Sequence, residues 1–171
     1  MTEAAVPAPG PTLLPTGRME GRVAFADLVR QALTCAAQEG WPRIILSDAD
    51  FADWPLGERS VVDALQAWSR RGRELHFLAR DFNPLRQRHP RLVQWRVTWS
   101  HIVDARVCRG AAGEAVPSAI WSPAWTLERV DPQRCVMLCS REPARASLLH
   151  EKIDACWQLG APSFAATTLG L

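Results

Sequence analysis

The sequence predicts an α/β fold with a layered, mostly parallel sheet, flanking helices and a late β-hairpin. Apolar residues recur at helical spacing in residues 22–39, 58–70 and 142–159. Short apolar runs at residues 43–47 and 74–79 are typical of buried strands. Strands that alternate with helices indicate a largely parallel sheet, because each helix returns the chain to the end at which the previous strand began.

The first half of the chain is expected to alternate helices with strands. Residues 1–21 are rich in Pro, Ala and Gly and are predicted to be a flexible lead-in to a single α/β domain over residues 22–171. The first helix stops at Gly40. A short helix begins at Asn83-Pro84, because Asn caps well and Pro suits a first turn, and His89-Pro90 interrupts it.

The second half is predicted to contain more strand than helix. Residues 96–108 are expected to form a third strand, which a Gly/Ala/Pro loop follows. Strands over residues 118–130 and 134–140 are joined by Asp131-Pro132-Gln133, a tight hairpin signal. The helix over residues 142–159 completes the order.

Composition and charge exclude several classes of protein. No stretch reaches the 18 or so apolar residues of a membrane span, and the N-terminus lacks the pattern of a secretory signal, so we expect a cytoplasmic protein. The 5 cysteines are odd in number and form no C-x-x-C, which argues against disulfides and zinc. We therefore expect no metal and no cofactor. The net charge of +2 is uneven, because residues 58–110 alone hold eleven basic and five acidic side chains.

Three aspartates follow a predicted strand in the stretch IILSDADFADWPLG, residues 44–57. The D-x-D spacing of Asp48 and Asp50 resembles haloacid-dehalogenase-like phosphatases, in which the first Asp is the nucleophile and the second a general acid beside magnesium. The companion residues of that family are missing, since no Ser or Thr ends the second strand and the only lysine, Lys152, lies in the last predicted helix. The alternative is that Asp50 or Asp53 bonds backbone N–H groups of a turn, and this capped-turn interpretation is favoured.

Other polar side chains suggest a binding surface. His101 lies in the third predicted strand, and a phosphoesterase that pairs it with Asp48 or Asp50 is an alternative enzyme hypothesis. Arginines are concentrated in the middle of the chain, and several of the 8 tryptophans follow them. Aromatic and basic side chains together suit nucleic acid or another anion, although they also suit a packed core beneath a solvated surface. The candidate ligand-binding residues are therefore Asp48, Asp50, His101, Arg86, Arg88 and Arg91.

The order of elements over residues 42–159 resembles one half of the phospholipase D superfamily. The segments that carry the resemblance are the strand ending near Asp48, ELHFLARDF, the hairpin LERVDPQRCVMLCS and the helix EPARASLLHEKIDACW. The chain is similar to bacterial proteins that have a phospholipase-D-like domain without its active site.

The superfamily's H-x-K-x4-D motif is absent from the position where the resemblance places it. With Asp131 as the motif aspartate, Ala124 occupies the histidine position and Thr126 the lysine position, while Cys139-Ser140 lies near the Gly-Ser pair. A literal H-x-K at residues 150–152 lies in the last predicted helix and lacks its aspartate. The resemblance therefore implies a non-catalytic binding module and, because active members pair two halves, a homodimer.

Overall fold

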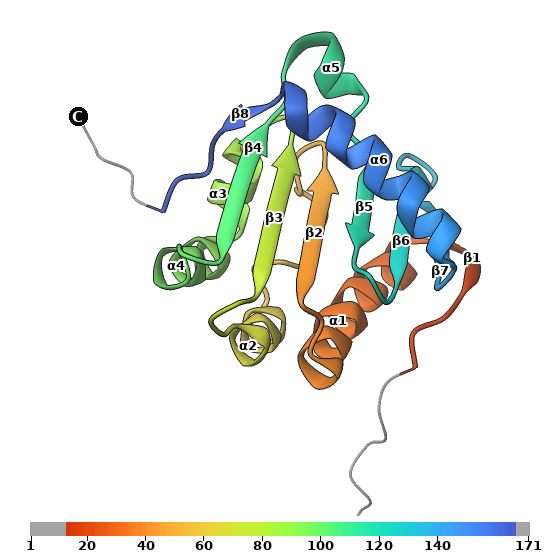
Figure 1. The fold of residues 1–171 in the computed structure, drawn as a ribbon, viewed down its shortest axis with the longest axis horizontal. Coiled ribbons are helices and arrows are strands. Elements are labelled where there is room, and N and C mark those ends of the chain that lie inside the picture. Colours follow the sequence, from red (N-terminus) through yellow and green to blue (C-terminus); the bar gives the residue numbers. More distant parts are fainter. Residues whose placement is uncertain (1–12, 167–171) are drawn as a thin grey trace, which may run out of the picture.

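An open sheet with the strand order β1-β7-β6-β5-β2-β3-β4-β8 organises residues 13–166, the part of the chain that the computed structural model describes (Figure 1). The strands are β1 (Gly17–Glu20), β2 (Arg43–Asp48), β3 (Glu74–Ala79), β4 (Val103–Val107), β5 (Ser118–Trp121), β6 (Thr126–Asp131), β7 (Val136–Ser140) and β8 (Ala161–Pro162). The helices are α1 (Arg22–Glu39), α2 (Arg59–Trp68), α3 (Asn83–Arg88), α4 (Pro90–Thr98), α5 (Gly110–Glu114) and α6 (Pro143–Leu159).

The predicted α/β class, with flanking helices and a late hairpin, is confirmed, but the sheet is mixed. Strands β2, β3 and β4 are parallel neighbours, as the alternation of strands and helices predicts. The pairs β1·β7, β6·β7, β5·β6, β2·β5 and β4·β8 are antiparallel. The chain between β5 and β7 makes short reversals without crossover helices, and neighbouring strands joined by such reversals must run antiparallel. The prediction of a mostly parallel sheet is therefore correct only for the β2–β3–β4 centre.

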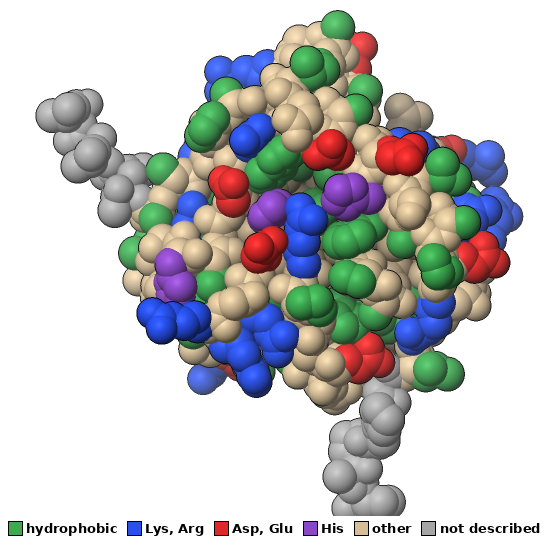
Figure 2. All heavy atoms as spheres, in the orientation of Figure 1, with side chains coloured by type: hydrophobic (Ala, Val, Ile, Leu, Met, Phe, Trp, Pro, Cys, Tyr) green, Lys and Arg blue, Asp and Glu red, His purple; other side chains and the backbone are tan. Residues whose placement is uncertain are grey.

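The two faces of the sheet are covered unequally. Helices α1 to α4 pack on one face, over the large core that contains Phe25, Phe51 and Trp68. Helix α6 crosses the other face, where Ile45 and Leu78 belong to a smaller cluster with the apolar side of the helix (Figure 1). On this second face, basic, acidic and histidine side chains gather over the middle of the sheet below α6 (Figure 2).

Three segments differ from the prediction, and the first is the expected Gly/Ala/Pro loop, which contains the short helix α5. Residues 96–102 are not strand, because α4 continues to Thr98 and a turn precedes β4. The expected strand over 118–130 is broken at Ser122, whose hydroxyl accepts hydrogen bonds from the backbone N–H groups of Ala124 and Trp125 at 3.3 and 2.9 Å. The pair Ser122-Pro123 thus begins a turn that separates β5 from β6.

The N-terminal end of the described chain is better ordered than the sequence predicts, and the C-terminal end is packed against the sheet as well. Residues 1–12 of the expected lead-in lie outside the described residues, but Gly17–Glu20 form β1 and pair with β7 from Gly17 opposite Cys139. Leu14, just before this strand, is buried. At the other end, Phe164 is 1% exposed and its ring packs against Phe77 and Phe82. Apolar anchors therefore hold these segments against the sheet.

Candidate functional site

The carboxylate of Asp48, at the end of β2, is fully engaged by the protein itself. One oxygen lies 3.1 Å from Nη2 of Arg129, and the other accepts hydrogen bonds from the backbone N–H groups of Phe51 and Asp50 at 2.8 and 3.2 Å. The Asp48 side chain is only 5% exposed. Asp50 in turn accepts a hydrogen bond from the backbone N–H of Ala52 at 2.9 Å, as the capped-turn interpretation expects.

Arg129 of β6 is the centre of a buried ion-pair cluster that it forms with Asp48 and Asp53. Its guanidinium contacts both carboxylates, and its Nε donates to the hydroxyl of Ser118 at 2.9 Å. The guanidinium also lies 4.2 Å from the centre of the Phe25 ring. Burial opposes its charge, but the hydrogen bond to Asp53 and the charge of Asp48 outweigh it and keep the pKa of Arg129 above its ordinary value.

This cluster explains the three aspartates without catalysis. A phosphoryl nucleophile needs a carboxylate oxygen that faces a substrate, whereas both oxygens of Asp48 already have partners inside the fold. Within residues 13–166, no group of three or more His, Cys, Asp or Glu side chains is arranged to hold a metal ion. Sequence reasoning missed Arg129 because its partner Asp48 is 81 residues away. The available signal was an arginine inside a strand of the predicted hairpin.

His101 does not join the aspartates. It is exposed in the turn before β4, where its ring lies 5.6 Å from that of Trp99. Asp48 lies at the end of β2, and β2 and β4 both pair in parallel with β3. His101 and Asp48 are therefore at opposite ends of the parallel strands, and the phosphoesterase pairing of these two residues is not formed.

Arg86, Arg88 and Arg91 lie together on α3 and the start of α4. Arg88 and Arg91 donate hydrogen bonds to the backbone oxygens of Ala52 and Gly57, at 3.4 and 3.1 Å. The Arg86 guanidinium lies 5.6 Å from the centre of the Phe164 ring. None of the three is among the arginines that form ion pairs within residues 13–166. Their charges are therefore free to meet an external anion.

Two further arginines extend this positive region. Arg80 follows β3 and Arg109 follows β4, and both line an open hollow of about 380 Å³ together with Asp81 and Asn83. Because Asn83 begins α3, the hollow adjoins the segment that carries the other three arginines. We call Arg80, Arg86, Arg88, Arg91 and Arg109 the arginine surface.

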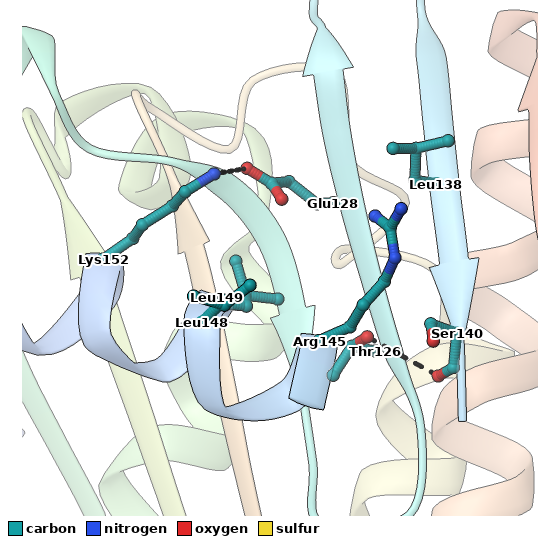
Figure 3. A pocket seen from close by; sticks show the side chains of 8 residues that line it. All are labelled: Thr126, Glu128, Leu138, Ser140, Arg145, Leu148, Leu149 and Lys152. Carbon is teal, nitrogen blue, oxygen red and sulfur yellow. Dashed lines mark hydrogen bonds and ion pairs between the residues drawn. The ribbon is translucent and has the colours of Figure 1, made fainter. Parts of the chain in front are cut away.

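A groove of about 310 Å³ lies between the β6–β7 hairpin and α6 (Figure 3). Thr126 and Ser140 face each other across the two strands, and the Thr126 hydroxyl contacts the Ser140 backbone oxygen at 3.5 Å. Arg145 and Lys152 of α6 complete the wall, and Lys152 is paired with Glu128 at 2.9 Å. The groove thus brings together two positions that the resemblance aligned with catalytic parts of the phospholipase D motif.

Among residues 13–166, no histidine lines the groove. The Ser140 hydroxyl accepts a hydrogen bond from the backbone N–H of Glu142 at 3.0 Å, next to the start of α6. The hydroxyls of Thr126 and Ser140 and the ion pair of Glu128 with Lys152 are therefore engaged within the fold.

No protein-family model matches the chain, and no curated protein sequence matches it. Among solved structures, the chain is similar to TrmBL2, an archaeal chromatin protein with a novel mode of DNA binding, with a TM-score of 0.61 and 12% identity over 95% of this chain. The chain spans 57% of the length of that protein.

A second structure defines the fold class. The chain is similar to Nuc from Salmonella typhimurium, a phospholipase D family member, with a TM-score of 0.53 and 12% identity. The match covers 78% of this chain and 90% of Nuc. The chain therefore has a phospholipase-D-like α/β fold. Within the described residues, no helix is both long and apolar enough to cross a membrane.

Proposed function

We propose that the chain is a non-catalytic phospholipase-D-like module that binds the phosphate backbone of a nucleic acid through its arginine surface. The observation that carries the proposal is the group of five arginines on and beside α3, none of which forms an ion pair within residues 13–166. Arginines free of carboxylate partners contribute to phosphate binding without first breaking an ion pair.

The geometry of the remaining sites supports a binding role. Asp48 is held by Arg129, and the groove between the β6–β7 hairpin and α6 contains no histidine. Hydrolysis of a phosphate ester needs a nucleophile and a proton donor on one open cleft, and His101 and Asp48 lie at opposite ends of the parallel strands. The DNA binding described for TrmBL2 is compatible with a nucleic-acid partner here.

The experiment measures retention on a polyanion column as a function of salt. The triple variant R86E/R88E/R91E is expected to elute at lower salt than the wild type, with a shallower salt dependence of binding, because fewer counterions are released. The matched control is R18E/R22E/R134E, which makes the same charge change on the β1 side and the hairpin turn. Equal loss of retention in both variants would contradict a localised surface.

The enzyme hypothesis has a separate test. Magnesium-dependent hydrolysis of a generic phosphate ester, abolished by Asp48→Asn, would favour a phosphatase over a binding module. We expect no hydrolysis, because the ion pair of Asp48 with Arg129 must break before either oxygen reaches a substrate. The homodimer that the resemblance implies is also part of this proposal, and sedimentation equilibrium of the full chain measures it.

A further inference from the structure

A second polar cluster lies on the other face of the sheet, away from the arginine surface. Arg43 of β2 sits between His76 of β3 and His150 of α6, with its Nη2 3.2 Å from Nδ1 of His76 and its Nη1 3.5 Å from Nε2 of His150. The three side chains line a pocket of about 230 Å³, which Asp154 and Gln158 of α6 complete. This is where charged and histidine side chains gather below α6 in Figure 2.

Aromatic rings hold the three side chains in place. The Trp157 ring stacks on His76, with centres 4.8 Å apart and planes at 10°. The Trp121 ring meets His150 edge to face at 4.9 Å, and Arg43 lies 5.7 Å from the same ring. Trp121 is fixed in turn by a hydrogen bond of 2.9 Å to the backbone oxygen of Ala146. The cluster is therefore rigid before any ligand arrives.

The guanidinium of Arg43 lacks a well-placed anionic partner. Its Nε is buried and has no hydrogen-bond acceptor, and the nearest carboxylate, that of Glu74, lies 3.6 Å away on a side chain that is 61% exposed. A guanidinium only donates hydrogen bonds, so the two imidazole nitrogens that face it are the acceptors. An arginine held mainly by two imidazoles has unused capacity for an anion.

We propose that the pocket of Arg43, His76 and His150 binds a tetrahedral oxyanion, such as the terminal phosphate of a phosphate monoester. The oxyanion accepts hydrogen bonds from the Arg43 guanidinium in place of the two imidazoles. His76 Nδ1 then loses its donor, becomes protonated and donates to the anion itself, while His150 borders the same anion. Binding therefore takes up protons, and the site distinguishes a phosphate monoester from the backbone phosphates that the arginine surface meets.

The charges around the pocket set the direction of the pH dependence. The groups that face the histidines are Arg43 of β2, Glu74 of β3, Asp104 and Arg106 of β4, and Asp154 of α6. Burial, followed by the charge of Arg43, lowers the pKa of His76 below its ordinary value. His76 is therefore neutral near pH 7 in the free protein, and affinity for a fixed-charge anion must rise as the pH falls.

Sulfate is the probe for this dependence, because its charge does not change between pH 6 and pH 8. Titration calorimetry of the full chain is expected to show binding that tightens by about tenfold over this range. Repeating it in buffers with different ionisation enthalpies measures the proton uptake directly. Inorganic phosphate at pH 6 is expected to compete with sulfate for the same site.

The variants separate this pocket from other anion sites. Arg43→Gln is expected to weaken sulfate binding by about tenfold or more, since a charged donor is lost. His150→Gln, on the outer helix α6, is expected to weaken sulfate binding less than Arg43→Gln does, because it removes a neighbour of the anion and leaves the guanidinium in place. The control His101→Gln changes an exposed histidine outside the pocket and should leave binding unchanged.

Two results would overturn the proposal: no sulfate binding in the millimolar range at pH 6, or equal affinity in the wild type and Arg43→Gln. Retention of Arg43→Gln on a polyanion column tests whether the pocket binds a phosphate monoester or the phosphates of a nucleic-acid backbone. Unchanged retention together with lost sulfate binding shows a separate monoester site. Lost retention in Arg43→Gln would show that the pocket meets backbone phosphates and refute its assignment to monoesters.

Discussion

Replacing Arg129 with methionine should destabilise the fold strongly, because it leaves Asp48 without a cation. The side chains of Arg129 and Asp48 are 3% and 5% exposed, so solvent cannot replace the lost ion pair. Removing one partner of a buried ion pair costs about 3–5 kcal/mol of unfolding free energy. Methionine keeps much of the apolar stem of Arg129 but loses the contact of the guanidinium with the Phe25 ring, so the loss reports the charge together with this contact.

A double-mutant cycle turns this expectation into a test. The double variant D48N/R129M removes both buried charges, and its loss of unfolding free energy should be smaller than the sum of the single losses. Asp53→Asn should cost at most about 1 kcal/mol, since that carboxylate is 43% exposed and water screens it. Urea unfolding followed by the fluorescence of buried tryptophans such as Trp54 and Trp125 measures all four variants.

The result that would refute this reasoning is equally specific. A loss below about 1 kcal/mol in Arg129→Met, at an unchanged dependence on urea, would mean that the cluster is not a buried charge network. Additive losses in the cycle would mean that Asp48 and Arg129 do not depend on each other. In either case the ion pair with Arg129 would no longer account for Asp48, and its oxygen Oδ1 would again be available for chemistry.

Three smaller predictions concern packing and protonation. Gly57→Ala should lower the melting temperature, because a Cβ there would lie 2.9 Å from Nδ1 of His89 and crowding of this kind costs about 1–3 kcal/mol; an unchanged melting curve would contradict it. Trp68→Phe removes a 2.8 Å hydrogen bond to the buried backbone oxygen of Trp41 and should cost about 1–3 kcal/mol in urea unfolding; a loss below measurement error would count against that bond. Burial raises the pKa of Cys139 to about 12 from 9.0, so its contribution to stability is complete below pH 9.0 and is lost as the pH rises toward about 12. Alkaline unfolding should therefore be less steep in Cys139→Ala, and identical slopes would show that this thiol is not responsible.

The helices and the central strands could be predicted because their signals are local. Residues 22–39 and 74–79 have the bounds that periodicity predicts. The segment RVTWS at 96–100 was misread because valine, threonine and tryptophan favour strands, whereas packing decides the outcome here. Arg96 is 7% exposed, and its guanidinium lies near the ring of Phe164, a residue close to the C-terminal end. A short window of sequence around Arg96 cannot predict a contact with a residue so far along the chain.

The sites were less predictable than the fold for the same reason. Asp48 and Asp50 were placed correctly at the end of a strand, yet the role of Asp48 depends on Arg129, which only the strand order brings near. The pocket of Arg43, His76 and His150 draws on β2, β3 and α6, and two of its members are 107 residues apart. His76 had no distinguishing neighbour in the sequence, and His150 stood out only through the H-x-K at residues 150–152. The arginine surface could be anticipated because its residues are concentrated between residues 80 and 109.

The two edge strands of the sheet come from the two ends of the described chain, and this has a consequence for self-association. β1 and β8 have only 4 and 2 residues, and short edges offer a poor template for pairing with another molecule. Behind β1 lies β7, whose sequence VMLCS is apolar. A truncation that removes residues 1–20 would leave the backbone of β7 unpaired, so such a fragment should aggregate where the full chain stays dispersed. By pairing with β7, the N-terminal strand is therefore expected to limit aggregation of the protein.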